Sequence, residues 1–179
     1  MKYLLFSFLT FFNIYVLSAP MPATSSSDFL KIDIGLFRSP LGFEVSSEKT
    51  NWLHSEVPKE QKFIATVYKA PQSQKGVQPL LTVRLDSLNK SKTLNQYMRD
   101  WVKTYPRLGF QVLGTQKVTI ENKRGFLIDL IHNKSHRQVR QVVFVKDKKA
   151  IVMSCRGHQD GFRTIVKSCN QIFRNFKWI

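Results

Sequence analysis

The sequence predicts an α+β fold in which an antiparallel sheet of about six to seven strands is covered by two main helices. Two observations lead to this prediction. Two segments carry one continuous apolar face at helical spacing, and between them four apolar runs follow one another at hairpin spacing. Amphipathic helices need an apolar surface to cover, and a sheet provides one.

Three segments rich in strand-forming residues precede the first helix. Residues 35–45 predict a first strand with a turn at Ser39-Pro40-Leu41-Gly42. Two further runs, at 63–68 and 80–85, are rich in branched and aromatic residues and predict two more strands. The polar stretch between them, residues 71–79, is expected to be a loop.

The first helix is predicted to begin after Thr93, because Gln96 three residues later completes a capping box. Apolar side chains then recur every three or four residues, at Leu94, Tyr97, Met98, Trp101, Val102 and Tyr105. Pro106 and Gly109 are expected to end this helix.

A four-strand meander is expected next, over residues 110–120, 126–132, 139–146 and 150–155. Its connections are short and polar: Asn122-Lys123-Arg124-Gly125, Asn133-Lys134-Ser135 and Asp147-Lys148-Lys149. A last helix is expected from about Asp160 to Phe173, with one apolar face made by Phe162, Ile165, Val166, Cys169, Ile172 and Phe173.

The N-terminus has the pattern of a secretory signal peptide. Lys2 is followed by a short apolar run that ends at small residues, so we expect cleavage after Ser18, with an uncleaved anchor as the alternative. Residues 1–18 are thus a signal peptide, 19–34 a flexible linker, and 35–179 a single domain. The protein is expected to be exported, to the periplasm or the extracellular space.

The chain is strongly basic, with a formal net charge of +16. Such a charge favours acidic partners, either an acidic protein or an anionic envelope lipid or polymer. Nucleic acid is not expected, because it is scarce outside the cytoplasm. Contact with a membrane surface and the oligomeric state stay open.

Alternate turns of a meander fall at the same end of the sheet. The turns at 122–125 and 147–149 are therefore expected to merge into one basic rim, made by Lys123, Arg124, Lys146, Lys148 and Lys149. This rim could bind an anionic partner, or its lysines could only protect turns and strand edges from aggregation.

No catalytic, metal or cofactor site is predicted. His132 and His136 flank one turn, but a zinc site needs three or four protein ligands, and the neighbouring residues offer only cations. The chain has no Gly-x-Ser-x-Gly elbow and no phosphate-binding glycine loop. A non-enzymatic binding or accessory protein is therefore expected, and a small exported hydrolase without a recognisable motif is the alternative.

Cys155 and Cys169 are the only cysteines. An even cysteine count in an exported chain favours a disulfide, which would tie the last helix to the sheet. A helix that starts near Asp160 would, however, carry Cys169 about 13 Å along its axis, away from a strand that ends at Cys155. Two buried, reduced cysteines are therefore the alternative.

The order and spacing of these segments resemble the PsbP/Mog-like α/β/α sandwich family, which includes bacterial exported PsbP-related and DcrB-like proteins. The resemblance covers about residues 37–178 and rests on Pro40-Leu41-Gly42-Phe43-Glu44-Val45, Thr93-Leu94-Asn95-Gln96-Tyr97, Arg124-Gly125-Phe126, Gln141-Val142-Val143-Phe144-Val145 and Ala150-Ile151-Val152-Met153-Ser154, with a closing helix over 162–173. It implies a sandwich with helices on both faces of the sheet, and a binding or accessory role without a shared catalytic site. It assigns no binding residue in this chain.

Overall fold

The protein is described from a computed structural model, which describes residues 35–57, 60–88, 90, 92–146 and 148–179. The signal peptide (residues 1–18) and linker (19–34) predicted from the sequence lie outside these residues. Within them, no helix is long and apolar enough to cross a membrane.

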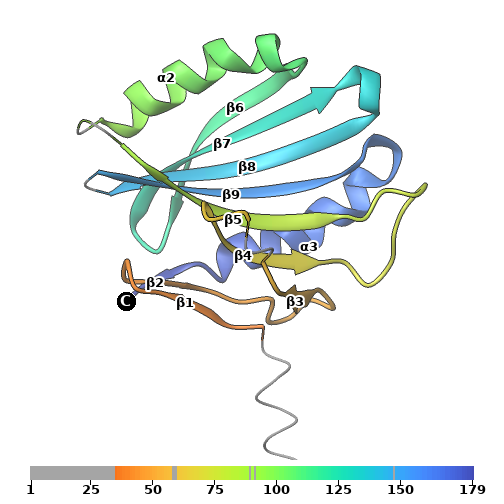
Figure 1. Ribbon diagram of the computed structural model, residues 1–179, viewed down its shortest axis with the longest axis horizontal. Helices are drawn as coiled ribbons and strands as arrows, with labels where there is room; N and C mark the ends of the chain where they lie inside the picture. The colour runs from red at the N-terminus through yellow and green to blue at the C-terminus, as the bar shows by residue number, and fades with distance from the viewer. Residues whose placement is uncertain (1–34, 58–59, 89, 91, 147) are drawn as a thin grey trace, which may run out of the picture.

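A seven-stranded antiparallel sheet forms the centre of the fold (Figure 1). Its strands lie in the order β3-β4-β5-β9-β8-β7-β6. Their bounds are β3 Leu53–Ser55, β4 Ile64–Lys69, β5 Leu80–Ser87, β6 Gln111–Ile120, β7 Lys123–His132, β8 Arg137–Lys146 and β9 Lys149–His158. The predicted meander is therefore present as β6 to β9, and the fold class is confirmed.

The two main helices pack on opposite faces of this sheet. Helix α2 (Leu94–Thr104) begins with the predicted capping box, in which Thr93 and Gln96 each accept a hydrogen bond from the other's backbone N–H. Helix α3 (Phe162–Arg174) buries five side chains of its apolar face. Short 3₁₀ turns join the elements: η1 (Tyr105–Leu108), η2 (Asn133–Ser135) and η3 (Gln159–Gly161).

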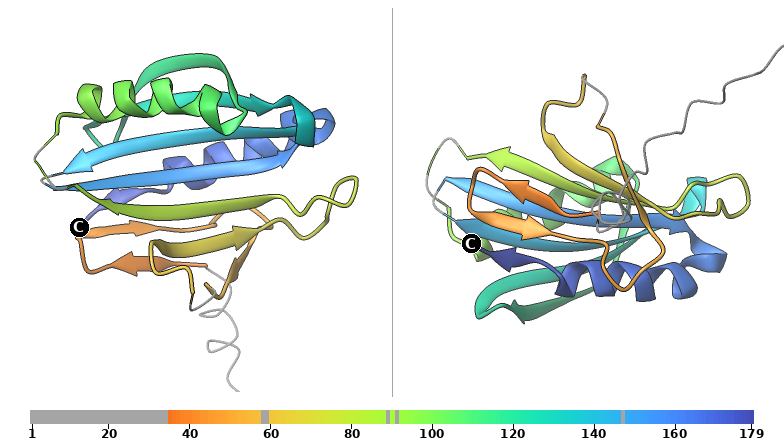
Figure 2. Two further views of the ribbon diagram at one scale, coloured as in Figure 1. Left: turned by 45° about the horizontal axis from the view of Figure 1, so that its top comes forward. Right: turned by 90° about the horizontal axis from the view of Figure 1, so that it is seen from below.

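A second, three-stranded sheet accompanies α3. It is made by β1 (Phe37–Ser39), β2 (Phe43–Val45) and β10 (Lys177–Trp178), in the order β1-β2-β10. Figure 2 shows the β1–β2 hairpin beside the chain's last strand. The sequence predicted a single strand over 35–45 and did not predict β3 or β10, because two or three residues are too short to show an alternation.

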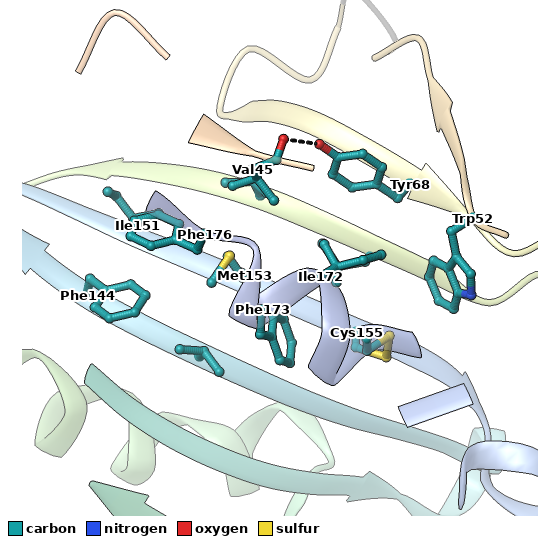
Figure 3. Packing of buried hydrophobic residues seen from close by; sticks show 14 of the residues in the cluster. Val45, Trp52, Tyr68, Phe144, Ile151, Met153, Cys155, Ile172, Phe173 and Phe176 are labelled. Carbon is teal, nitrogen blue, oxygen red and sulfur yellow. Dashed lines mark hydrogen bonds between the residues drawn. A yellow bond between two sulfur atoms is a disulfide. The ribbon is translucent and has the colours of Figure 1, made fainter. Parts of the chain in front are cut away.

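The alternation of side chains along β9 divides the core in two. Ile151, Met153 and Cys155 face α3 and the small sheet, whereas Ala150 and Val152 face α2. Figure 3 shows the first of these layers, where the Tyr68 hydroxyl donates a hydrogen bond of 2.8 Å to the Val45 carbonyl. The small sheet is thereby fixed to the large one.

The expected disulfide is present between Cys155 and Cys169, whose Cα atoms are 6.0 Å apart. The geometric objection fails because β9 does not end at Cys155 but continues to His158. Cys155 then lies about 10 Å before the end of the strand, and Cys169 lies about 10 Å beyond the start of α3 at Phe162. The two cysteines are therefore level with each other.

Two turn boundaries also differ from those predicted. The β6–β7 turn is formed by Glu121 and Asn122, both with positive φ (48° and 59°), so Lys123 and Arg124 lie in β7. Lys149 belongs to β9, where it pairs with Lys146. A two-residue turn such as Glu121-Asn122 matches the twist of antiparallel strands, which explains why β6 and β7 extend to this turn.

Candidate functional site

The sheet splits at one end, between β7 and β8. The ladder that joins these two strands starts at Phe126 and Val143, whereas the ladders on either side continue to Ile120–Lys123 and to Lys146–Lys149. The tip of the β6–β7 hairpin consequently curves away from the tip of the β8–β9 hairpin (Figure 1). The split brings residues of both tips to the wall of one cavity.

Gly125 lies at the root of the split, where β7 begins to leave β8. A Cβ atom at this position would lie 2.8 Å from the Phe144 ring and 3.2 Å from the Val143 carbonyl oxygen. Glycine therefore lets the Phe144 ring lie against the β7 backbone. The sequence suggested a turn at this glycine, but the structure assigns it a packing role inside a strand.

The cavity in the split has a volume of about 680 Å³, within the usual range of small-molecule sites. The tips of both hairpins, the start of α2 and the last strand supply its walls. The lining residues are Thr93, Leu94, Asn95, Lys117, Val118, Thr119, Lys123, Arg124, Gly125, Phe126, Phe144, Val145, Lys146 and Trp178. Apolar side chains thus lie next to four cationic ones.

Three members of the predicted basic rim meet at this cavity: Lys123, Arg124 and Lys146. Lys148 is exposed in the neighbouring turn. Lys149 lies at the same end of the sheet, and its Nζ donates a hydrogen bond of 2.7 Å to the Ser87 hydroxyl of β5. Lys149 and Lys146 also line a smaller cavity of about 90 Å³.

Sequence reasoning missed Lys117 and Trp178. Lys117 pairs with Phe126 across β6 and β7. This register follows from the position of the Glu121-Asn122 turn, whereas the sequence predicted the turn at residues 122–125. Trp178 packs edge-on against Phe43, Phe144 and Phe176. The one available signal was an aromatic residue next to a basic one near the end of the chain, which did not decide between packing and exposure.

Lys146 and Trp178 form a contact that orders the cavity wall. The Lys146 Nζ lies 5.0 Å from the centroid of the Trp178 ring, which is the geometry of a cation–π interaction. Among the described residues, the indole N–H of Trp178 is buried without a hydrogen-bond partner. The wall therefore holds a cation against an aromatic ring whose own N–H is buried and unpaired.

The chemistry of the lining suits the binding of an anion. Lysine, arginine and the indole N–H can only donate hydrogen bonds, so they match acceptors such as carboxylates and phosphates. The described lining residues include no histidine, cysteine or carboxylate side chain that could transfer a proton or attack a substrate.

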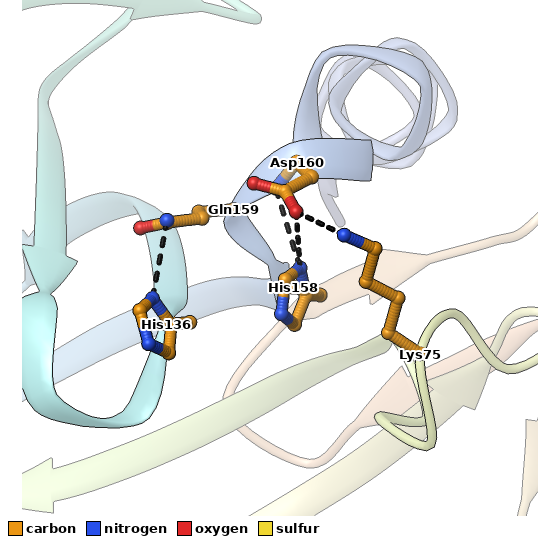
Figure 4. A network of polar contacts seen from close by, with 5 residues as sticks. All are labelled: Lys75, His136, His158, Gln159 and Asp160. Atoms are coloured by element: carbon orange, nitrogen blue, oxygen red, sulfur yellow. Dashed lines mark hydrogen bonds and ion pairs between the residues drawn. The ribbon is translucent and has the colours of Figure 1, made fainter.

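A second polar cluster lies at the opposite end of the meander, around the start of α3 (Figure 4). The rings of His136 and His158 are stacked with centroids 6.1 Å apart, and Gln159 contacts His136 at 3.2 Å. Asp160 lies 3.7 Å from His158 and forms an ion pair with Lys75. This ion pair lowers the pKa of the Asp160 carboxyl.

The two histidines proposed to flank one turn have different partners. The His132 Nδ1 accepts a hydrogen bond of 3.2 Å from the Ser135 N–H, and the ring packs edge-on against Phe110. His136 instead stacks on His158. In the part of the chain that the structure describes, no group of three histidine, cysteine or acidic side chains is placed to hold a metal ion.

Comparisons with solved structures agree with the architecture. The cyanobacterial PsbP protein CyanoP from Synechocystis sp. PCC 6803 is similar over 80% of this chain and 91% of its own, with a TM-score of 0.56 and 12% identity. This chain has the PsbP-like fold. The fold implied by the sequence resemblance is therefore confirmed.

Two further proteins share the PsbP-like fold. LpqN of Mycobacterium tuberculosis, described as involved in cell envelope biogenesis, has a TM-score of 0.60 at 15% identity, with 88% of this chain and 98% of that chain covered. PA94 of Pseudomonas aeruginosa, of unknown function, has a TM-score of 0.57 at 12% identity, with 78% and 92% covered. No protein-family model and no curated protein sequence matches the chain.

Proposed function

We propose that this protein is an exported, non-enzymatic binding or accessory protein. It docks an acidic partner protein through the basic side chains that line the cavity in the split. One observation carries the proposal: Lys117, Lys123, Arg124 and Lys146 come from three strands and meet at one cavity. Four cations held close together raise the local concentration of an acidic partner and speed its association.

Export is supported by the disulfide and by the N-terminal sequence. Disulfides persist in oxidising compartments and are rare in the cytosol of ordinary organisms. LpqN, which shares the fold, is described as involved in cell envelope biogenesis, and an envelope-associated accessory role for this chain is part of the proposal.

The exported hydrolase is the less supported alternative. Hydrolases most often use a histidine, a cysteine or a carboxylate at the cavity, and the described lining of the split contains only threonine hydroxyls and lysine and arginine side chains as reactive groups. The His158–Asp160 contact lies at the far end of the meander, and its carboxylate is already paired with Lys75.

Charge reversal tests the proposal. Lys123 and Arg124 are exposed, and within the described chain they make no side-chain hydrogen bond or ion pair, so changing both to Glu should leave folding intact. The double variant should lose most of the partner captured from envelope extract at low salt. Wild-type capture should itself decline as salt screens the charges.

The matched control is the pair Arg163→Glu and Lys167→Glu on the exposed side of α3, which changes the net charge equally. It should capture partner as the wild type does. Equal loss in both variants would show that net charge alone attracts partners, and unchanged capture by the Lys123/Arg124 variant would refute the proposed site.

A further inference from the structure

We propose that the cavity in the split is a binding site for a small amphipathic anion, a molecule with one carboxylate or phosphate group on an apolar chain or ring. This inference deepens the proposed function, because it shares Lys123, Arg124 and Lys146 with the docking surface. The inference differs from the proposed function because it places a small ligand inside the cavity, whereas the proposed function places a partner protein over the cavity opening.

The floor of the cavity is aromatic. The floor is formed by Phe144 from β8 and Trp178 from β10, which both lie on the α3 side of the large sheet, whereas Phe126 lines the cavity from β7 on the α2 side. Phe144 is fully buried, and its ring stacks on Phe176 at a centroid distance of 4.7 Å, so the floor is fixed in position. A rigid apolar surface of this kind favours a ligand that brings its own apolar body.

The rim above this floor is cationic. Lys117, Lys123 and Arg124 are exposed side chains on the β6–β7 hairpin, and Lys146 is exposed at the end of β8. Strand alternation places Lys123 and Lys146 on the same side of the sheet as Phe144, and Lys117 and Arg124 on the side of Phe126. The ammonium groups of Lys123 and Lys146, on the side of the aromatic floor, can bind a single anionic group while their aliphatic stems cover the apolar part of the ligand. A neutral apolar molecule would leave these cations without a partner.

The size and the donors of the cavity narrow the ligand class further. A volume of about 680 Å³ is far larger than a free inorganic anion requires. The indole N–H of Trp178 is buried and has no acceptor among the described residues, so an oxygen of the ligand would pair it only if the ring turns toward the cavity. A ligand with an anionic oxygen at one end and an apolar body at the other would contact both the cationic and the aromatic side chains of the lining.

The test uses the folded protein and three simple probes. Dodecanoate supplies both features, dodecanol supplies only the apolar chain, and inorganic phosphate supplies only the anion. By calorimetry or by displacement of anilinonaphthalene sulfonate, dodecanoate should bind at least about tenfold more tightly than either of the others. Equal binding of dodecanol and dodecanoate would overturn the inference.

Two variants locate the bound probe without removing any rim charge. Thr119 is exposed and lines the cavity, so Thr119→Trp should fill the space and weaken dodecanoate binding at least about tenfold with little effect on folding. Trp178→Phe keeps a ring but removes the indole N–H, and should weaken binding by a smaller factor. Unchanged affinity in Thr119→Trp would place the probe elsewhere and overturn the inference.

Two outcomes separate this inference from the proposed function. If Thr119→Trp stops dodecanoate binding but still captures the acidic partner, the cavity and the docking surface are both correct and distinct. If dodecanoate does not bind while partner capture still depends on Lys123 and Arg124, only the cavity inference fails. Binding to vesicles of anionic lipid without binding of monomeric dodecanoate would also contradict it.

Discussion

Gly125 is the residue on which the shape of the split depends. Any side chain here would meet the Phe144 ring at 2.8 Å and the Val143 carbonyl at 3.2 Å. Phe144 cannot move away easily, because it is fully buried and stacked on Phe176. The backbone of β7 must therefore shift when a larger residue replaces this glycine.

Gly125→Ala should destabilise the protein by about 1–3 kcal/mol, the usual cost of overpacking a core. Gly114 is the matched control, since a Cβ added there meets nothing within 4 Å and Gly114→Ala should change stability by less than about 0.5 kcal/mol. Urea unfolding of both variants measures the difference. Equal stability of the two variants would contradict the packing role of Gly125.

Burial of tyrosine hydroxyls makes the fold sensitive to alkali. Burial raises the pKa of Tyr105 to about 12, and it also raises the pKa of Tyr68 and Tyr97. Below about pH 10 these phenols are neutral in both states. Above that pH the unfolded chain ionises while the folded protein does not, so stability falls until the pH passes the folded-state pKa.

The free energy of unfolding should accordingly decrease from pH 10 to pH 12, with Tyr105 contributing about 1 kcal/mol per pH unit near the middle of that range. Tyr105→Phe removes this contribution and should flatten the decline. Urea unfolding at several alkaline pH values measures it. An identical slope in wild type and variant would argue against the raised pKa.

At the scale of elements, the strand β9 and the helix α3 form the unit that the disulfide joins. The bond links the face of β9 that carries Met153 to the buried face of α3. It closes a loop of 14 residues, which the chain-entropy relation values at roughly 3 kcal/mol. The bond also holds α3 over the large sheet.

Thiol titration of the unfolded, unreduced protein should find no free thiol, and replacing both Cys155 and Cys169 by Ser should cost roughly 3 kcal/mol of unfolding free energy. The double variant avoids leaving one reactive thiol. Two free thiols per chain would disprove the bond, and an unchanged stability in the double variant would disprove its structural role.

Local patterns explain which elements the sequence predicts well. The apolar face of α2, its capping box at Thr93 and the alternation of β8 are all encoded within a dozen residues, and they are found where expected. The strands β3 and β10 were missed because they carry three and two residues and form only through pairing with distant segments. The true end of β9 at His158 depends on its pairing with Arg137.

The candidate site was predicted only in part, for the same reason. Turn order in a meander was enough to bring Lys123, Arg124 and Lys146 to one end of the sheet. The split itself depends on where the β7–β8 ladder begins, and Lys117 and Trp178 reach the cavity through that geometry. No short sequence pattern encodes these contacts.

At the scale of the whole molecule, the proposed function rests on the net charge of +16 and on the N-terminal segment. We predict that the mature protein begins near Ala19, because the apolar run ends at residues that signal peptidases accept. Mass spectrometry of the native protein should show loss of residues 1–18. An intact N-terminus in the membrane fraction would show that the segment is retained as an anchor.

A positive charge spread over the whole surface differs from a charge focused at one site. Basic residues also lie on the exposed side of α3, at Arg163 and Lys167, which are not among the described lining residues of the cavity in the split. The proposal therefore requires that acidic ligands prefer the split to this second basic face.

The most direct test is an amide NMR titration with a short glutamate-rich peptide at low salt. The proposal predicts that the largest shift changes fall on residues 117–126 and 143–149 and on Trp178, and that they disappear in the Lys123→Glu/Arg124→Glu variant. Changes centred on α3, or spread evenly over the basic surface, would contradict the assignment of the split as the binding site.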